Sequence, residues 1–252
     1  MREPLLETLE LTRRFGGLAA VKSVSIAFAP GEVHAVIGPN GAGKTTLINL
    51  LSGDLPPTSG RILFKGQEIA GRPAHSISHL GIGRSYQKTN IFLNFTTRQN
   101  CWLAAQSRLP TSFRFFSPAH RRQDVAARAD KSLALTGLEA RAGRLAKEMS
   151  HGEQRQLEIA MMLATEPELL LLDEPMAGMG AEESERTVEL IRKLAADHTV
   201  VLIEHDMDAV FKLADRLTVM VNGEVLETGT PESIRTSPAV REAYLGEEEA
   251  LS

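Results

Sequence analysis

The residues whose types and spacing most clearly predict chemistry form one segment, Gly38-Pro39-Asn40-Gly41-Ala42-Gly43-Lys44-Thr45. It fills every fixed position of the pattern G-x-x-x-x-G-K-[ST] and follows the apolar run Val33–Ile37, which predicts a strand, a glycine-rich turn and a helix. Because glycine has no Cβ, backbone N–H groups can curl around the β- and γ-phosphates of a nucleotide. We expect Lys44 to place a positive charge on these phosphates, the Thr45 hydroxyl to bind Mg²⁺, and Thr46 to belong to the same site. The complete pattern disfavours a glycine-rich turn without a ligand.

A second candidate segment is Leu169-Leu170-Leu171-Leu172-Asp173-Glu174. Its leucines predict a buried strand, and the two carboxylates follow at the carboxyl end, where open α/β sheets bind ligands. Asp173 suits Mg²⁺, held directly or through water, and Glu174 can polarise an attacking water as a general base. Alone, this pair fits a solvated acidic loop equally well, but its combination with the phosphate-binding segment favours a functional site.

Alternating strands and helices are expected to position these residues. Strand-like runs are Ser23–Phe28, Val33–Ile37, Arg61–Phe64, Leu169–Leu172, Thr199–Ile203 and Leu217–Val221, and the clearest helical segments are Thr45–Ser52 and Ala181–Ala196. This alternation predicts an α/β fold with a mainly parallel sheet covered by helices. Asn222-Gly223 predicts a two-residue hairpin turn. Thr230 and Pro231 predict the cap and first residue of a helix.

The stretch from Asn90 to Thr165 has few β-branched runs and many Ala, Leu, Arg and Gln residues, which favours helices. Its middle, Leu109–His120, contains prolines and phenylalanines and is expected to be a loop. We therefore predict a single domain over residues 1–252, with a helical subdomain at 90–165 inserted into the α/β core.

Composition excludes several classes of protein. The net charge of −4 disfavours nucleic-acid binding, for which a basic face is typical. The single cysteine, Cys101, allows no internal disulfide and is expected to be a small buried residue. The N-terminus lacks the apolar core of a signal peptide, and no run reaches the ~18 apolar residues of a membrane span. We expect a cytosolic protein, unless another chain holds it at a membrane.

Five motifs in order resemble those of ABC-type ATPases. Met149-Ser150-His151-Gly152-Glu153-Gln154 resembles their signature motif and lies upstream of Asp173-Glu174-Pro175 at the spacing of that family. Three further residues match the adenine-stacking aromatic ahead of the first strand, the Q-loop glutamine and the switch histidine: Phe15, Gln87 and His205. The resemblance covers roughly Leu5 to Gly246. It implies a P-loop NTPase core with an antiparallel β portion, which binds and hydrolyses ATP with Mg²⁺.

The resemblance also implies roles for these residues. His205 would contact the γ-phosphate, and Gln87 would sense Mg²⁺ and the attacking water. Ser150 and Glu153 form an S-x-x-E capping box, so Ser150 could merely cap a helix, but a capped N-terminus beside Gly152 is also an anion site. In ABC ATPases this site, including Ser150, Gly152 and Glu153, meets the γ-phosphate bound by the opposite subunit. Two cassettes then face head to tail, close on ATP and open after hydrolysis. Without the other motifs, Phe15 would be interpreted as a core residue and His205 as a loop residue.

The chain departs from the family pattern at several positions. The usual signature has Leu, Gly and Gln where this chain has Met149, His151 and Glu153. The loop after Pro175 usually ends in Leu-Asp, whereas here Met179-Gly180 lacks the carboxylate. We expect the coupling between the two sites of a dimer to be weakened by this loss.

Details of the sequence are similar to ATPases of branched-chain amino acid importers. The matching segments are Gly81–Gln87, Thr89–Phe92, Ser150–Ala160, Ala177–Met179 and Glu242–Gly246. The resemblance implies two transmembrane permease subunits, a second and different ATPase subunit, and a periplasmic substrate-binding protein that acts indirectly. The chain would then lie peripherally at the cytoplasmic face of the inner membrane. Phe113–Phe116 and Arg121-Arg122 would border the groove for a permease coupling helix, unless they form an ordinary loop.

The sequence is also compatible with other functions. Urea or amide importers are close rivals, and an exporter of lipid or lipopolysaccharide would use a similar cassette. A soluble ABC ATPase of DNA repair or translation usually carries a coiled-coil or zinc insertion, which this chain lacks. A regulatory cassette that does not hydrolyse ATP is disfavoured by Glu174 and His205, although Gly180 leaves room for it.

Overall fold

The computed structural model describes residues 3–86, 89–109 and 123–243. The strands are β1 (Leu6–Phe15), β2 (Leu18–Phe28), β3 (Val33–Ile37), β4 (Ser59–Phe64), β5 (Gln67–Glu68), β6 (Ile82–Arg84), β7 (Leu169–Asp173), β8 (Thr199–Ile203), β9 (Arg216–Val221) and β10 (Glu224–Gly229). The α-helices are α1 (Lys44–Leu51), α2 (Ala74–His79), α3 (Thr97–Gln106), α4 (Gln123–Thr136), α5 (His151–Leu163), α6 (Ala181–Leu194), α7 (Met207–Leu213) and α8 (Pro231–Thr236). Two short 3₁₀ turns are η2 (Glu139–Arg141) and η3 (Ala146–Glu148).

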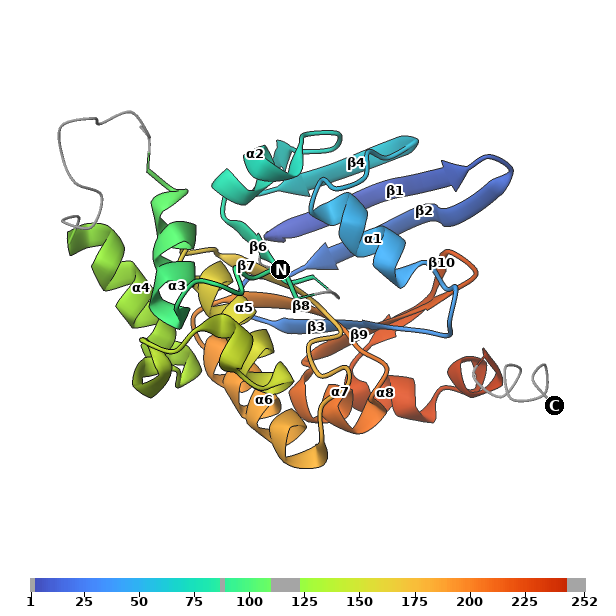
Figure 1. Ribbon diagram of the computed structural model, residues 1–252. Coiled ribbons are helices and arrows are strands. Elements are labelled where there is room, and N and C mark those ends of the chain that lie inside the picture. Colours follow the sequence, from blue (N-terminus) through green and yellow to red (C-terminus); the bar gives the residue numbers. More distant parts are fainter. Residues whose placement is uncertain (1–2, 87–88, 110–122, 244–252) are drawn as a thin grey trace.

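Two sheets lie on either side of α1 (Figure 1). The larger sheet has the order β10-β9-β3-β8-β7-β6, and all its neighbours are parallel except the β9–β10 pair. The smaller sheet is antiparallel, with the order β2-β1-β4-β5. The predicted α/β class with an antiparallel portion is therefore confirmed.

The parallel strands are buried on both faces, which explains why they read as apolar runs rather than alternating ones. In β7, Leu169 and Leu171 join the cluster that contains α1, whereas Leu170 and Leu172 join the cluster formed with α5, α6 and α7. Successive side chains of a strand point to opposite faces, so a run of four leucines serves both clusters at once. Helices α6 and α7 cover the face of the sheet that points away from α1 (Figure 1).

The predicted helical stretch forms a third apolar cluster, to which α3, α4 and α5 contribute. These helices stand at one side of the two sheets (Figure 1). Helix α5 belongs to two clusters, because Leu157 packs among the helices while Ile159 and Met162 pack under the sheet. The bounds 90–165 of an inserted subdomain remain a prediction. Of the expected loop Leu109–His120, all but Leu109 lies outside the described residues.

The structure corrects the start of the predicted fold. A first strand, β1, precedes the predicted one, and Phe15 is its last residue rather than a residue ahead of the first strand. Only one face of β1 is well buried, through Leu6, Thr8 and Leu11, so charged residues interrupt its apolar pattern. The strand is held by long-range pairing with β2 and β4, which local sequence does not reveal.

Two local predictions are confirmed at the C-terminal end of the core. Asn222 and Gly223 have φ of 50° and 84°, the left-handed values that a tight turn between β9 and β10 requires. Thr230 caps α8 by accepting a hydrogen bond from the Ser233 N–H at 3.3 Å, and Pro231 is the first helical residue.

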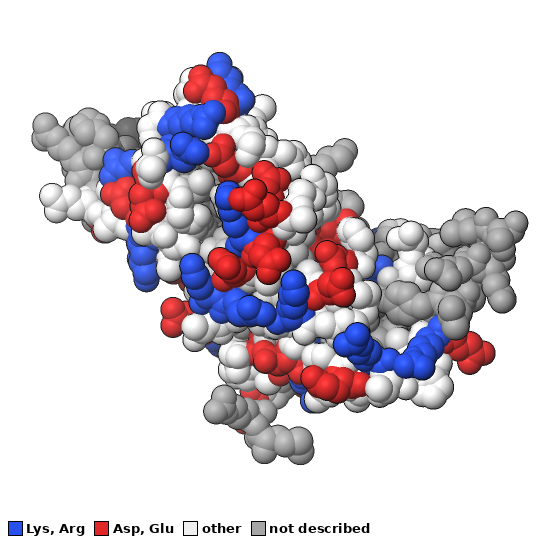
Figure 2. All heavy atoms as spheres, turned by 90° about the horizontal axis from the view of Figure 1, so that it is seen from below, with Lys and Arg blue, Asp and Glu red and all other residues white. Residues whose placement is uncertain are grey.

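Charge is mixed on the side of the molecule where α6, α7 and α8 lie. Figure 2 shows acidic and basic side chains intermingled there among the residues drawn in colour. The expectation that the chain binds no nucleic acid stays a prediction. Across the described ranges, no helix combines the length and the apolar character needed to cross a membrane.

Cys101 is fully buried in the cluster of α3, α4 and α5, as expected. Burial raises the pKa of its thiol to about 11, and the thiolate is the form that reacts with alkylating reagents. We expect the native protein to resist iodoacetamide at pH 8 and to be alkylated only after unfolding in urea, as followed by intact mass. Rapid labelling of the native protein would contradict this burial.

Candidate nucleotide site

The phosphate-binding segment connects β3 to α1 and is shaped by its glycines. Gly38, Gly41 and Gly43 have φ of 151°, 77° and 99°. A Cβ on Gly38 would lie 2.1 Å from the carbonyl oxygen of Met220, and one on Gly43 would lie 2.2 Å from that of Ala20. Both distances are far below contact, so no other residue fits at these two positions.

The loop is clamped between β2 and the β9–β10 turn. The Gly223 N–H donates to the Ala42 carbonyl at 3.0 Å, and the Lys22 N–H donates to the Gly223 carbonyl at 2.7 Å. Pro39 is half-buried, whereas Asn40 stands exposed at the tip of the loop. The hairpin turn that the sequence predicted as a separate feature therefore supports the phosphate-binding segment.

Positive charge gathers at the mouth of this loop. The Lys44 ammonium folds back and donates to the Gly38 and Pro39 carbonyls at 2.6 and 2.9 Å. The N-terminal end of α1, with its partial positive charge, begins at the same residue. Thr45 is exposed and Thr46 is half-buried in the first turn. The arrangement suits an anion held by backbone N–H groups and one ammonium group.

Asp173 is the last residue of β7, and Glu174 follows it at the same edge of the sheet. Asp173 is 2 % exposed, and its carboxylate lies 3.6 Å from the Arg84 guanidinium. Burial raises the pKa of Asp173, and the charge of Arg84 opposes that rise. Glu174 has φ of 48°, a strained value for a residue with a side chain, and its N–H donates to the Ile203 carbonyl at 2.9 Å.

His205 follows β8 and meets the predicted base. Its Nδ1 lies 4.0 Å from Glu174 Oε1 and 3.8 Å from Glu204 Oε2, and its side chain is 66 % exposed. The structure therefore brings together two residues that lie 31 positions apart in the sequence (205 − 174). Glu204 was not among the predicted site residues, and only its position beside His205 could have suggested it.

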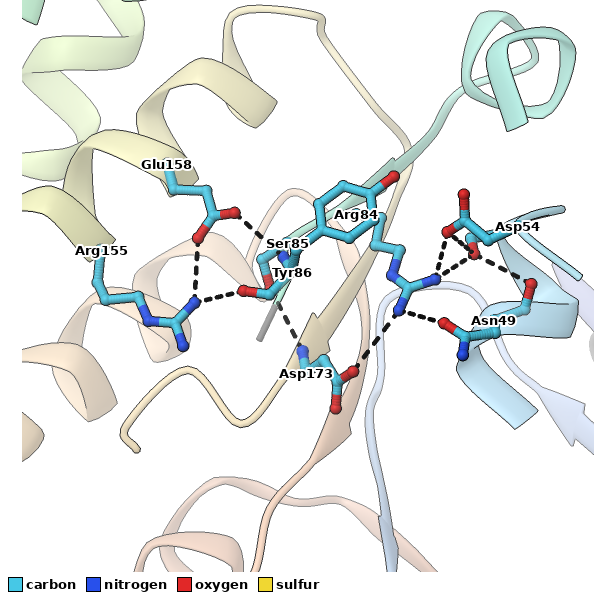
Figure 3. A network of polar contacts seen from close by, with 9 residues as sticks. Asn49, Asp54, Arg84, Ser85, Tyr86, Arg155, Glu158 and Asp173 are labelled. Atoms are coloured by element: carbon cyan, nitrogen blue, oxygen red, sulfur yellow. Dashed lines mark hydrogen bonds and ion pairs between the residues drawn. The ribbon is translucent and has the colours of Figure 1, made fainter. Parts of the chain in front are cut away.

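Arg84, which was also not predicted as a site residue, joins several elements (Figure 3). Its guanidinium donates to Asn49 Oδ1 at 2.6 Å and to the carboxylate of Asp54, and it lies 4.7 Å from the centre of the Tyr86 ring. Through the same group it reaches Asp173. The end of α1, β6 and the end of β7 are thus tied by one buried cation.

A second buried pair ties α5 to the segment around Gln87. Arg155 Nη1 lies 3.1 Å from Glu158 Oε2 and also donates to the Tyr86 carbonyl. Glu158 Oε1 accepts a hydrogen bond from the Tyr86 N–H at 3.2 Å (Figure 3). The same oxygen accepts one from the Asn90 N–H at 3.3 Å. Burial raises the pKa of Glu158, and these partners oppose the rise. Gln87 itself lies outside the described residues.

The predicted capping box is confirmed at the start of α5. Ser150 Oγ accepts from the Glu153 N–H at 3.2 Å, and Glu153 Oε2 accepts from the Ser150 N–H at 2.9 Å. This backbone donor is the main cause of the lowered pKa of Glu153, with help from Arg141 at 2.8 Å. A Cβ on Gly152 would lie 2.7 Å from a carboxylate oxygen of Glu183, so the end of this α6 side chain lies against the segment.

Phe15 ends β1 with its ring 45 % exposed. The Arg13 guanidinium lies 4.7 Å from the ring centre. Such a half-exposed aromatic face is available to stack on a planar ring.

The donors at the site fit Mg²⁺, an ion that prefers oxygen and takes one or two protein ligands beside phosphates and water. The Thr45 hydroxyl lies in the first turn of α1, which follows β3, and the Asp173 carboxylate lies at the end of β7, on the other side of β8. They are the residues that would hold the ion.

Parts of the sequence match known protein families. Residues 21–177 match a family model described as ABC transporter. Residues 224–250 match one described as branched-chain amino acid ATP-binding cassette transporter.

Three relatives match almost the whole chain. The high-affinity branched-chain amino acid transport ATP-binding protein LivG of Escherichia coli (strain K12) is 42 % identical, over 98 % of this chain and 100 % of its own length. BraF of Pseudomonas aeruginosa, described in the same words, is 43 % identical with the same coverage. A probable LivG of Archaeoglobus fulgidus is 34 % identical over 98 % of this chain and 97 % of its own.

Solved structures share the fold. The ADP conformation of MJ1267, an ATP-binding cassette of an ABC transporter, has a TM-score of 0.85 at 30 % identity and covers 96 % of this chain and 98 % of its own. Dimeric MJ0796, a bacterial ABC transporter cassette, has a TM-score of 0.77 at 23 % identity and covers 90 % of this chain and 98 % of its own. At that identity the second likeness concerns the fold alone.

The Arg155–Glu158 pair generates a stability prediction, because removing one member strands a buried charge. Its side chains are 5 % and 6 % exposed, whereas those of the helical pair Arg186–Glu182 are 64 % and 83 % exposed. We expect Arg155→Met to lower the unfolding free energy by about 3–5 kcal/mol and the control Arg186→Met by less than ~1 kcal/mol. Urea titration followed by circular dichroism measures both, and equal losses would contradict the prediction.

Proposed function

The chain belongs to the ABC transporter family of ATPases, and on that premise we propose that it is the energy-coupling subunit of an importer for branched-chain amino acids. The observation that carries this proposal is the 42 % identity to LivG, which extends over nearly the full length of both chains. The match of residues 224–250 to the branched-chain amino acid model adds support outside residues 21–177, which match the general ABC transporter model. The substrate itself would not touch this subunit.

ATP would bind at the loop between β3 and α1. Backbone N–H groups of Gly38–Thr46 and the Lys44 ammonium would hold the β- and γ-phosphates, and the exposed Phe15 ring would stack on adenine. Thr45 and Asp173 would hold Mg²⁺, which neutralises phosphate charge and fixes the orientation of the phosphates when bound. The clamped glycine loop and the folded-back Lys44 side chain support this assignment.

Hydrolysis would depend on Glu174 and His205. Glu174 would accept a proton from the attacking water, and His205 would contact the γ-phosphate. The 4.0 Å approach of their side chains supports a joint role. Gln87 would sense Mg²⁺ and the water.

Two cassettes would face head to tail. Ser150 and Gly152, at the N-terminal end of α5, would then meet the γ-phosphate bound by the opposite subunit. The Ser150–Glu153 capping box supports this, because it holds the N-terminal turn of α5 in a fixed shape. ATP would close the pair and hydrolysis would open it. Gly180 is the residue directly before α6 and provides no side-chain cap, and the missing carboxylate would weaken coupling between the sites.

Permease subunits would dock on the helical side of the molecule. Phe92, Leu93 and Phe95 are exposed large apolar side chains between the Gln87 segment and α3, and the two phenylalanine rings stack at 5.3 Å. Such a patch is typical of a protein interface. The partners would be two transmembrane permeases and a second, different ATPase subunit, with a periplasmic binding protein acting indirectly. The chain would lie at the cytoplasmic face of the inner membrane.

The assembly can be tested by a pull-down of tagged protein from detergent-solubilised native membranes with ATP present, with partners identified by mass spectrometry. We expect two multi-span permeases and a second ATPase, and Phe92→Ser should reduce their recovery. Leu226 is an exposed apolar residue on β10, and Leu226→Ser is the matched control, which should not reduce the recovery of these partners. Recovery of ribosomes or DNA-repair proteins instead would overturn the proposal that the chain is a transporter subunit. Recovery of the permeases of a urea, amide or lipid transporter would keep the transporter proposal but change the proposed substrate.

The proposed base makes a separate prediction. Glu174→Gln removes proton acceptance but keeps the shape of the side chain, so we expect turnover to fall by about 10²–10⁴-fold. ATP-dependent pairing, measured by size-exclusion chromatography, should persist.

Lys44→Ala is the contrasting variant, because it should lose ATP affinity and pairing together. Wild-type turnover in Glu174→Gln would exclude Glu174 as the base, and unchanged nucleotide binding in Lys44→Ala would overturn the phosphate site.

A further inference from the structure

Glu204 is a buried ionisable group that the proposed mechanism does not use. It lies between β8 and α7, directly before His205, and is 1 % exposed. A carboxylate taken out of water is costly unless hydrogen bonds compensate it. The contacts of Glu204 therefore indicate what the group does.

The two oxygens of Glu204 serve two different loops. Oε1 accepts a hydrogen bond from the Met176 N–H at 2.9 Å, in the loop that follows β7. Oε2 accepts from the His205 N–H at 3.2 Å, in the loop that follows β8. The same Oε2 lies 3.8 Å from His205 Nδ1. One side chain thus joins the loop that carries Glu174 to the loop that carries His205.

The loop after β7 needs such an anchor, because Glu174 is strained. Its φ of 48° is in the left-handed region, which persists only where the surroundings hold it. On one side, the Glu174 N–H is held by the Ile203 carbonyl at 2.9 Å. On the other side, Met176, two residues later, is held by Glu204.

We propose that Glu204 is a positioning residue for ATP hydrolysis, which holds the Glu174 loop and His205 in one arrangement through its two carboxylate oxygens. This inference rests on the proposed function of Glu174 and His205. A displacement of a catalytic group by about 1 Å can cost about 100-fold in rate. Loss of the anchor should therefore slow the chemical step and leave ATP binding, which uses the Lys44 loop, unchanged.

Glu204→Gln tests the inference with little change in shape. The amide has one acceptor oxygen, so its NH₂ group must face a backbone N–H donor at Met176 or at His205. In the full-length chain we expect kcat for ATP to fall by at least ~10-fold, with KM and the affinity for a fluorescent ATP analogue within about twofold. In the nucleotide-free protein, hydrogen exchange should become faster at the backbone amide that loses its acceptor, either Met176 or His205.

Glu32→Gln is the matched control. Glu32 is also a carboxylate that accepts a backbone hydrogen bond, from the Ala29 N–H at 2.9 Å, but it precedes β3 at the opposite end from the site. We expect the kcat of the Glu32→Gln variant to match that of the wild-type protein. Glu204→Asp, which keeps two acceptors on a shorter side chain, provides a second variant if Glu204→Gln does not fold, and a similar loss of kcat is expected from it.

A double variant separates positioning from a general effect on folding. If Glu204 acts through Glu174, Glu174→Gln combined with Glu204→Gln should lose little more than Glu174→Gln alone. A folded Glu204→Gln with wild-type kcat and unchanged exchange at both the Met176 and His205 amides would overturn the inference and leave the ATPase assignment intact. Fully additive losses would overturn it as well. Failure of Glu174→Gln to slow turnover would instead remove the proposed base.

Discussion

The parallel order of β3, β8 and β7 is the constraint on which the rest of the site depends. Ile203 of β8 pairs with Val36 on one side and with Asp173 on the other, so the three strands end in register. Because parallel strands share one carboxyl edge, the loops that follow them meet there. The glycine loop, the acidic pair and His205 come from distant parts of the chain and reach a common edge for this reason. The helices and the antiparallel sheet bury the faces of the strands that set this register.

Buried ions connect these loops to the rest of the molecule. Arg84 joins α1 to the end of β7, Arg155 and Glu158 join α5 to β6, and Glu204 joins the two loops beyond β7 and β8. Such ions are weak contributors to stability, since desolvation offsets much of their attraction. Their hydrogen bonds are directional, however, and each one connects segments that lie far apart in the sequence.

The two halves of the proposed site lie on different parts of one chain. The Lys44 loop, Glu174 and His205 belong to the sheet edge, whereas Ser150 and Gly152 begin α5 on the helical side. Close packing of Glu183 on Gly152 connects that helix to α6, and α6 follows the loop that Glu204 anchors. The same loop thus runs from the proposed base to the surface offered to a second cassette.

The features that the sequence predicted correctly are those that depend on interactions between residues close together in the chain. The strand, glycine turn and helix around Lys44, the Ser150–Glu153 capping box and the Asn222-Gly223 turn each depend on residues a few positions apart. The order of motifs was enough to identify the family.

What the tertiary structure alone decided is the set of long-range partners. Phe15 ends a strand that exists only through pairing with β2 and β4, and Gly38 is required because the Met220 carbonyl lies against it. Arg84 and Glu204 look like ordinary charged residues in the sequence, because the groups that give them a role come from other strands and loops.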